Sequence, residues 1–195
     1  MEAPTIYLPP RLELKIDLTD EQFWQLCQNN DDLRFETTAT GELIIMSPTG
    51  GYTSDRNSDL NFQLRAWNRQ NNLGKVFDSN GGFILPNGSK RSPDSSWLKM
   101  ERWNALTEEE RDRFMPLCPD FVVELMSPSD TLAKTREKME EYMENGAQLG
   151  WLINRKKRQV EIYRPNREVE ILDNAQTVSG ENILPGFVLD LATIW

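Results

Sequence analysis

Residues 119–130, PDFVVELMSPSD, hold the stretch that decides the fold: an almost unbroken apolar run followed by signals for the start of a helix. Such a short apolar run is typical of a strand buried on both faces. Strands of this kind occur where helices cover a sheet, which predicts a mixed sheet flanked by helices in the α/β or α+β class. Glu124 interrupts the run. Because an ionised carboxylate is expensive to bury without a partner, the fold has to supply a compensating positive charge.

The elements predicted around this strand alternate between helices and strands. Apolar spacing and capping residues predict helices over residues 17–30, 52–72 and 131–146. The core order becomes helix, three strands, helix, two strands. The other predicted elements are a hairpin over 33–46, strands over 74–86 and 90–100 joined by the turn PNGS, a surface helix over 102–114 capped by Thr107, a hairpin over 149–165 and an irregular apolar tail over 180–195.

Composition narrows the possible chemistry. The 195 residues fit a single domain, 1–195, divided here into an N-terminal helix and hairpin (1–50), a core (51–165) and a C-terminal extension (166–195). The chain has no histidine, and its two cysteines form no CxxC pair, which excludes the usual zinc sites and histidine-dependent triads. Catalysis would therefore use carboxylates, lysine, hydroxyls or a hard metal ion.

Charge and hydropathy indicate where the protein acts. The net charge of −9 counts against tight, nonspecific binding of nucleic acid, although it leaves room for a local basic groove. No run approaches the length of a membrane-spanning helix, and the N-terminal residues MEAPTIYLPPRLELK lack the pattern of a secretory signal. The expectation is a cytoplasmic protein with no membrane partner.

Asp94 is the first of three polar residues with a candidate role. It lies in KRSPDSSW (90–97), where Pro93 has no backbone donor and favours an edge or bulge position. In an extended segment, Ser92, Asp94 and Ser96 point to one face. An Asx turn or a loop carboxylate is the alternative for Asp94, and pairing with a core arginine is the alternative for Glu124.

Lys138 is the third candidate. It lies in the predicted helix 131–146, at the margin of the buried side that residues such as Met139 and Tyr142 define. From there its ammonium group could reach the strand that precedes the helix. The alternative is a lysine that extends into solvent, which fits Lys134, one turn earlier, better than Lys138.

Together these three residues fit one chemistry. Two carboxylates on adjacent strands can hold Mg²⁺ or Mn²⁺, which prefer oxygen ligands. Such a metal lowers the pKa of a bound water and neutralises charge on a scissile phosphate, while a lysine stabilises the transition state. Metal and lysine would also supply the positive charge that Glu124 needs.

The arrangement resembles the PD-(D/E)xK nuclease superfamily, in which a Pro-Asp is followed by an acid in an apolar strand and by a lysine. More narrowly, the chain resembles the Uma2 family of restriction-endonuclease-like proteins, the DUF820 group abundant in cyanobacteria. The resemblance covers nearly the whole chain, in the family's order. The matching stretches are GELIIMSPTG (41–50), LGKVFDSNGGFILPNG (73–88), RSPDSSW (91–97), PDFVVELMSPSD (119–130), REKMEEYMENGAQLGWLIN (136–154), QVEIYRP (159–165) and LPGFVLDL (184–191).

The resemblance implies a restriction-endonuclease-like α/β core, a divalent metal and hydrolysis of DNA phosphodiester bonds. By position, Asp94 and Glu124 would be the metal carboxylates. The superfamily's usual lysine lies two residues after the acid, where this chain has Met126, so its role would pass to Lys138 on the following helix. A further ligand often comes from the first core helix, which favours Asn57; Asp55 and Glu42 are weaker candidates.

Two other functions fit the same residues. One is a catalytically inactive nuclease-fold module that binds nucleic acid or protein, with a homodimer as one possible form. The acidic balance and the missing lysine at position 126 favour it. The other is hydrolysis of a different phosphoester, which uses the same metal chemistry.

Overall fold

The larger of two β-sheets forms the centre of the molecule. The structure, a computed structural model, describes residues 11–195; residues 1–10, on which much of the expectation about a secretory signal rests, lie outside the described part. Six strands occur in the order β11-β10-β9-β8-β7-β4. Their bounds are β4 Gly74–Asp78, β7 Ser95–Lys99, β8 Phe121–Leu125, β9 Leu149–Asn154, β10 Gln159–Tyr163 and β11 Glu170–Asp173.

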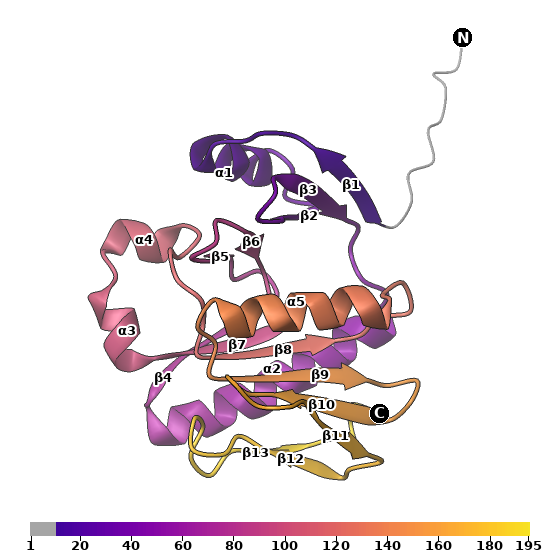
Figure 1. Ribbon diagram of the computed structural model, residues 1–195. Helices are drawn as coiled ribbons and strands as arrows, with labels where there is room; N and C mark the ends of the chain where they lie inside the picture. Colours follow the sequence, from indigo (N-terminus) through magenta and orange to yellow (C-terminus); the bar gives the residue numbers. More distant parts are fainter. Residues whose placement is uncertain (1–10) are drawn as a thin grey trace.

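The buried strand β8 organises this sheet. It pairs antiparallel with β7 and parallel with β9, and helix α5 (Leu132–Glu144) makes the crossover between the parallel strands. Side chains alternate along β8, so that Phe121 and Val123 pack on one face and Val122 on the other. Helix α2 (Gly51–Asn71) covers the first face and α5 covers the second (Figure 1). The predicted mixed sheet flanked by helices is confirmed.

A smaller sheet lies on the far side of α5 (Figure 1). Its five strands have the order β1-β3-β2-β6-β5. Helix α1 (Asp20–Gln28), which Thr19 caps, packs against this sheet through Phe23, Phe35 and Leu43. The strand bounds are β1 Arg11–Lys15, β2 Arg34–Thr37, β3 Glu42–Met46, β5 Phe83–Ile84 and β6 Lys90–Arg91.

Within residues 74–100 the chain crosses between the two sheets twice, which corrects the predicted strands 74–86 and 90–100. Each of these strands is split: β4 and β7 belong to the larger sheet, and the short hairpin β5–β6 belongs to the smaller one. At the first break Gly82 lets the Phe114 ring pack directly on the backbone, where a Cβ would lie 2.1 Å from that ring. At the second break Pro93 has no donor for a ladder. Asp94 therefore lies where the chain re-enters the larger sheet.

Two further predictions need correction. The single surface helix over 102–114 is instead a pair, α3 (Met100–Ala105) and α4 (Glu108–Asp112), because Thr107 forms a capping box that starts a new helix. The tail is not irregular throughout: β12 (Thr177–Ser179) and β13 (Val188–Asp190) form a two-stranded sheet that packs on the α2 side of the core. Strands β1 and β11 were not predicted.

The remaining predicted elements are confirmed with small shifts at their ends. They are the helices at α1, α2 and α5 and the hairpins β2–β3 and β9–β10. Helix α2 ends at Asn72, which adopts the left-handed conformation (φ 51°) two residues before Gly74. Among residues 11–195, no helix is both long and apolar enough to cross a membrane.

Candidate active site

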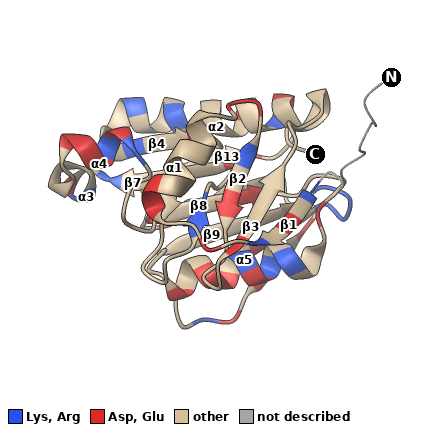
Figure 2. Ribbon diagram, turned by 90° about the horizontal axis from the view of Figure 1, so that it is seen from above, with Lys and Arg blue, Asp and Glu red and all other residues tan. Residues whose placement is uncertain are grey.

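A charged cavity of about 800 Å³ lies where the smaller sheet, the larger sheet and α5 meet. Its walls come from β2, the entry to β7, the end of β8, the loop before α5 and the first turns of α5. β2 carries one acidic residue, Glu36, and α5 carries both signs of charge (Figure 2). Three of the four residues that the sequence singles out line the cavity: Asp94, Glu124 and Lys138. The fourth, Asn57, lies outside the lining and donates a hydrogen bond to Asp94.

Glu124 points from β8 toward α5, since it lies on the same face of the strand as Val122. Its Oε1 atom lies 2.8 Å from Lys138 Nζ and accepts a hydrogen bond of 3.0 Å from the Tyr142 hydroxyl. Burial raises the pKa of Glu124 to about 7, because the Lys138 charge only partly offsets desolvation and the neighbouring carboxylates of Asp94 and Glu36. The predicted compensation of Glu124 by Lys138 is therefore present as an ion pair.

Glu36 on β2 is the second carboxylate that holds Lys138, and the sequence analysis missed it. Its Oε1 atom lies 2.8 Å from Lys138 Nζ and accepts a hydrogen bond of 3.0 Å from the Ser92 amide. Burial alone would raise the pKa of Glu36, but the charges of Lys138 and Arg91 lower it to about 2. Glu36 is therefore ionised at neutral pH, and Lys138 is held between two carboxylates from different sheets.

Arg91 on β6 ties these groups together. Its guanidinium donates to Glu36 at 3.3 Å and to Glu141 on α5 at 2.6 Å. Because Arg91 and Glu36 are both nearly fully buried, these pairs are shielded from solvent. The smaller sheet is thus joined to α5 by a buried network of charges behind Lys138.

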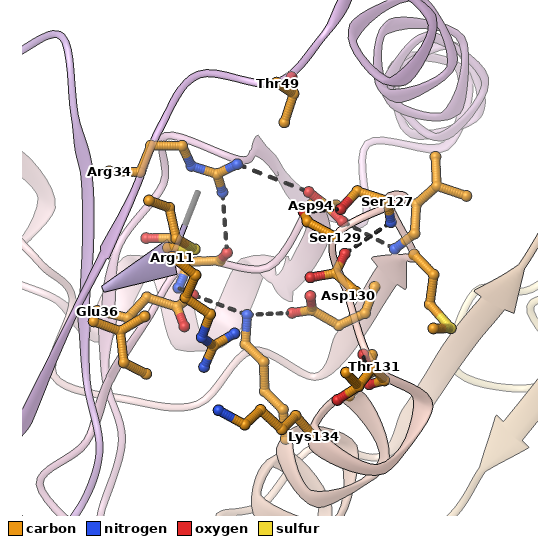
Figure 3. Close-up of a pocket in the computed structure, with 18 of the residues that line it drawn as sticks. Arg11, Arg34, Glu36, Thr49, Asp94, Ser127, Ser129, Asp130, Thr131 and Lys134 are labelled. Carbon is orange, nitrogen blue, oxygen red and sulfur yellow. Dashed lines mark hydrogen bonds and ion pairs between the residues drawn. The ribbon is translucent and has the colours of Figure 1, made fainter. Parts of the chain in front are cut away.

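Asp94 has a separate set of partners at the entry to β7. Its Oδ2 atom accepts a hydrogen bond of 2.9 Å from the Leu125 amide, which lies next to Glu124 in the chain, and its Oδ1 atom accepts one of 3.2 Å from Asn57 Nδ2. Arg34 faces Asp94 across the cavity at 4.0 Å (Figure 3). Burial raises the pKa of Asp94, and the Arg34 charge offsets part of this effect.

Asn57 on α2 supplies an oxygen beside Asp94. Its Oδ1 atom is buried and has no hydrogen-bond partner among the described residues. Asn61, one turn later, holds the same segment by donating to the Asp94 carbonyl at 3.1 Å. Of the weaker candidates, Glu42 is exposed at the rim of the cavity, and Asp55 is exposed on α2 outside the lining.

Met126 occupies the position where the superfamily's lysine is usual. Its side chain packs at the border of the apolar cluster around Val122 and Met139. The ammonium group at this site comes from Lys138 instead, at the spacing the sequence analysis expected. Lys134, one turn before Lys138, is half exposed and pairs with Glu13 on β1.

Four residues of the site were not predicted: Glu36, Arg91, Arg34 and Tyr142. In the segment RFET, Glu36 alternates with Phe35, which is the ordinary pattern of a strand with one solvated face. No local pattern shows that the far side of this strand meets α5 rather than water. Tyr142 was predicted to be buried, but its hydrogen bond to Glu124 depends on the tertiary fold.

The acidic side chains offer a metal only part of a coordination sphere. Among residues 11–195, no three or more His, Cys, Asp or Glu side chains are grouped closely enough to hold a metal ion by themselves. Mg²⁺ is usually bound by one or two carboxylates, with waters and substrate phosphate completing the octahedron. The candidate ligand atoms, from the carboxylates of Asp94 and Glu124 and the amide of Asn57, are all oxygens. Asn57 Oδ1 also lacks a partner among residues 11–195, so these residues fit a hard divalent metal.

Comparison with known proteins places the chain in a family. Residues 20–192 match the model of Uma2, a family described as "Putative restriction endonuclease". A crystal structure of a "putative nuclease belonging to DUF820" from Anabaena variabilis ATCC 29413 is similar with a TM-score of 0.75 and 20% sequence identity, over 91% of this chain and 97% of that chain. At this identity the similarity shows the fold alone. No curated protein matches the chain. Because the family model spans most of the sequence, the protein belongs to the Uma2 family.

Proposed function

We propose that this protein is a nuclease that hydrolyses nucleic-acid phosphodiester bonds, with DNA as its substrate and Mg²⁺ or Mn²⁺ as its cofactor. The observation that carries the proposal is the position of the Lys138 ammonium group. It lies 2.8 Å from Glu124 and 2.8 Å from Glu36, in the cavity that also contains Asp94. A fixed cation close to the carboxylates of Glu124 and Asp94 is an arrangement suited to metal-assisted phosphoryl transfer. Membership in the Uma2 family supports the same conclusion.

Asp94 and Glu124 would hold the metal through their carboxylate oxygens, with Asn57 Oδ1 as a further ligand. A bound divalent metal supplies a water of lowered pKa and a positive charge against the scissile phosphate. The Leu125 amide keeps one Asp94 oxygen oriented, because it donates to Oδ2 at 2.9 Å. Burial raises the pKa of Glu124, and the neighbouring carboxylates of Asp94 and Glu36 add to this effect, which a cation at this position would offset.

Lys138 would act on the phosphate as a fixed positive charge. Its pKa is raised because the charges of Glu124 and Glu36 outweigh the effect of burial, so it remains protonated at neutral pH. Glu36 is a positioning residue, since it contacts Lys138 rather than the reacting phosphate. The Arg34 guanidinium, which lines the same cavity, would hold the phosphate from the opposite side.

The test compares variants that keep the shape of each side chain. Asp94→Asn, Glu124→Gln and Lys138→Met should each reduce Mg²⁺- or Mn²⁺-dependent cleavage of a panel of DNA and RNA substrates by about a hundredfold or more. Lys99→Met is the control, because Lys99 is an exposed lysine at the end of β7 away from Asp94 and does not line the cavity. It should retain activity within a fewfold of the wild type.

Calorimetric titration with Mn²⁺ separates metal binding from cleavage. Binding should weaken in Asp94→Asn and Glu124→Gln but persist in Lys138→Met. Circular dichroism and thermal unfolding show whether each variant is folded. Cleavage that survives in folded Glu124→Gln and Lys138→Met would contradict the proposal, and so would tight binding of nucleic acid by a wild-type protein that cleaves nothing.

A further inference from the structure

A turn of four consecutive cations lies at the same end of the larger sheet as the candidate active site. Residues 155–158, RKKR, connect β9 to β10. β9 runs parallel to β8, and the Met126 amide donates to the Ile153 carbonyl at 3.0 Å, so the two strands end side by side. Figure 1 shows this turn on the side of the molecule where α2 and α5 begin. The turn is therefore near the cavity without being part of its lining.

A fifth cation next to this turn comes from a different element. Arg56 on α2 directly precedes Asn57, which donates to Asp94 in the candidate site. Burial and the charge of Arg56 both lower the pKa of Arg155, so the two guanidinium groups lie close enough to repel each other. Arg56 and residues 155–158 together form a surface that we call the basic patch.

Backbone oxygens hold Arg56 in this position. Its guanidinium donates to the carbonyl of Tyr52 at 2.9 Å, to that of Ile194 at 3.1 Å and to the Trp195 backbone oxygen at 3.4 Å. The patch thus joins the start of α2, the β9–β10 turn and the end of the chain.

Carboxylate side chains do not neutralise the basic patch. Among residues 11–195, none of its five side chains forms an ion pair with Asp or Glu, and the buried Arg155 Nε lacks a hydrogen-bond partner. Asp173 on β11 is next to the turn but accepts a hydrogen bond of 2.7 Å from Gln159 instead. In a chain of net charge −9, these cations make a local positive surface.

The backbone of the turn does not favour arginine at its last position. Arg158 has φ 52°, in the left-handed region that glycine or asparagine adopts with less strain. Hydrogen bonds fix this conformation, because the Arg158 amide donates to the Arg155 carbonyl at 3.2 Å and the Asn174 amide donates to the Arg158 carbonyl at 2.7 Å. The Arg158 guanidinium lies over the Trp195 ring, 5.6 Å from its centroid. The turn therefore presents a cation where stability alone favours glycine.

The basic patch is within reach of DNA bound in the cavity. Asp94 accepts from the Leu125 amide, and Leu125 is paired with Ile153 on the neighbouring strand. From Ile153 the chain advances two or three residues to the turn, on the order of 10 Å along the strand. Phosphates of one DNA strand are spaced by about 3.4 Å along the helix axis, so the turn would meet the backbone roughly three base pairs from the scissile bond.

We propose that the basic patch binds the sugar–phosphate backbone of a DNA duplex beside its scissile bond. The exposed side chains of Lys156, Lys157 and Arg158 contact the phosphates, and the half-buried Arg56 and Arg155 supply positive charge behind them. The inference rests on the proposed function for the identity of the ligand, but binding by the patch does not depend on cleavage.

The main test compares two double variants that remove the same number of charges. Lys156→Gln/Lys157→Gln alters the patch, and Lys99→Gln/Arg167→Gln is the matched control. Lys99 and Arg167 are exposed and lie at the opposite end of the larger sheet, beyond the paired residues of β7 and β8 and after β10.

Fluorescence anisotropy of a labelled DNA duplex in Ca²⁺ measures affinity at a series of salt concentrations. The patch variant should bind about tenfold more weakly than the wild type, and the slope of log affinity against log salt should fall in magnitude by roughly two. The control should remain within about twofold of the wild type, because phosphates do not reach that end of the sheet.

Arg158→Gly separates DNA contact from the stability of the turn. Glycine suits the positive φ of this position, so the thermal midpoint should stay close to that of the wild type. Affinity for the duplex should nevertheless fall about threefold, since one phosphate contact is lost. The amide resonances of Lys156 and Lys157 should shift when the duplex is titrated into the wild type.

The possible results separate this inference from the nuclease. Unchanged affinity and salt slope in Lys156→Gln/Lys157→Gln, or unmoved resonances in the turn, overturns the inference even if the wild type cleaves DNA. Binding of DNA that depends on the patch, in a protein that cleaves nothing, supports the inference and contradicts only the nuclease. Binding to vesicles of anionic lipid but not to DNA would also overturn it, in favour of a membrane surface.

Discussion

Lys138 lies between two carboxylates, Glu124 and Glu36, whose pKa values are shifted in opposite directions. Glu124 has the raised pKa of about 7, and Glu36 has the lowered pKa of about 2. Both are buried and both contact the same ammonium group. The difference arises because Glu36 has a second cation, Arg91, and a backbone amide as further partners, whereas Glu124 faces Asp94. One carboxylate is therefore fixed as an anion, and the other has the raised pKa that a metal, if bound as proposed, would lower.

The Glu36→Gln variant tests the positioning role. With one anion removed, the pKa of Lys138 should fall, because Glu36 is one of the two carboxylates that raise it. We expect kcat to fall by about 10–100-fold, and the alkaline limb of the pH–rate profile to move to lower pH. Glu13→Gln, which removes the partner of Lys134, is the control and should leave the profile unchanged. A lower rate with an unmoved alkaline limb would limit Glu36 to a structural role.

Glu124 should make the stability of the metal-free protein depend on pH. Its carboxyl has a pKa of about 7 in the folded protein and an ordinary pKa of 4.5 in the unfolded chain, so the folded state binds more protons between these values. The free energy of unfolding should therefore decrease as pH rises from about 4.5 to 7, by roughly 2–3 kcal/mol. Glu36 contributes nothing in this window, since its lowered pKa affects stability only below pH 4.5.

Chemical denaturation in EDTA at pH 5 and pH 8 provides the measurement. The Glu124→Gln variant should lack this loss of stability and exceed the wild type at pH 8. Mg²⁺ should restore the wild type at pH 8 and leave the variant unchanged. If the free energy of unfolding changed equally with pH in the wild type and in Glu124→Gln, Glu124 would be ionised throughout the range.

At the scale of elements, the sequence predicts what depends on neighbours in the chain. The buried strand over 120–126 and the helix after it follow from an apolar run, a proline and helical spacing, and together they bring Lys138 back to Glu124. Asp94 was predicted to lie in the extended segment 90–100, and the resemblance to the nuclease superfamily paired it with Glu124. What the sequence cannot show is which strand belongs to which sheet. The split of 74–86 and 90–100 depends on Phe114 packing on Gly82, a contact between residues far apart in the chain.

The residues of the candidate site also divide into those that the local sequence predicts and those that depend on the tertiary fold. Asp94, Glu124, Lys138 and Asn57 belong to the core order of helix, three strands, helix and two strands, and they meet in or beside one cavity. Glu36 and Arg91 come from the smaller sheet, whose position relative to α5 has no local signature. An exposed-looking glutamate such as Glu36 becomes recognisable only when its strand is known to face a charged helix.

The Gly74→Ala variant tests how closely β4 must approach β7. A Cβ at this position would lie 2.2 Å from the Leu98 carbonyl oxygen and 2.5 Å from the Trp97 ring, and backbone cannot move aside cheaply. Gly74→Ala should lower the free energy of unfolding by about 1–3 kcal/mol. Gly51→Ala is the matched control, because a Cβ there meets nothing within 4 Å. Thermal or urea unfolding measures both, and equal stability of the two variants would contradict the packing argument.

At the scale of the whole molecule, the two sheets are connected through charge as well as through the chain. Arg91 contacts Glu36 within the smaller sheet and Glu141 on α5, which packs on the larger sheet. Removing one member of a buried network leaves its partners unpaired, at a cost of about 3–5 kcal/mol. The network is therefore structural as well as a support for Lys138.

Arg91→Met should destabilise the protein by about 3–5 kcal/mol. It should also speed amide hydrogen exchange in β2 and β6 more than in β8 and β9. Arg113→Met is the control, because it breaks a pair with Glu21 whose side chains are 43% and 54% exposed. We expect at most about 1 kcal/mol for that change. A uniform rise in exchange across both sheets in Arg91→Met would contradict a local connection.

The sequence distances across the site also determine the order in which the protein folds. Glu124 and its partner Tyr142 are 18 residues apart, so β8, α5 and β9 close short loops, whereas Glu36 and Lys138 are 102 residues apart. Contacts between distant residues form late, after local ones have reduced the entropy cost of closure. Pulse-labelled hydrogen exchange during refolding should protect β8 and β9 before β2; simultaneous protection would contradict this order. A newly made chain would thus acquire a stable core before its charged cavity is complete, so the proposed nuclease activity would arise only at the last step of folding.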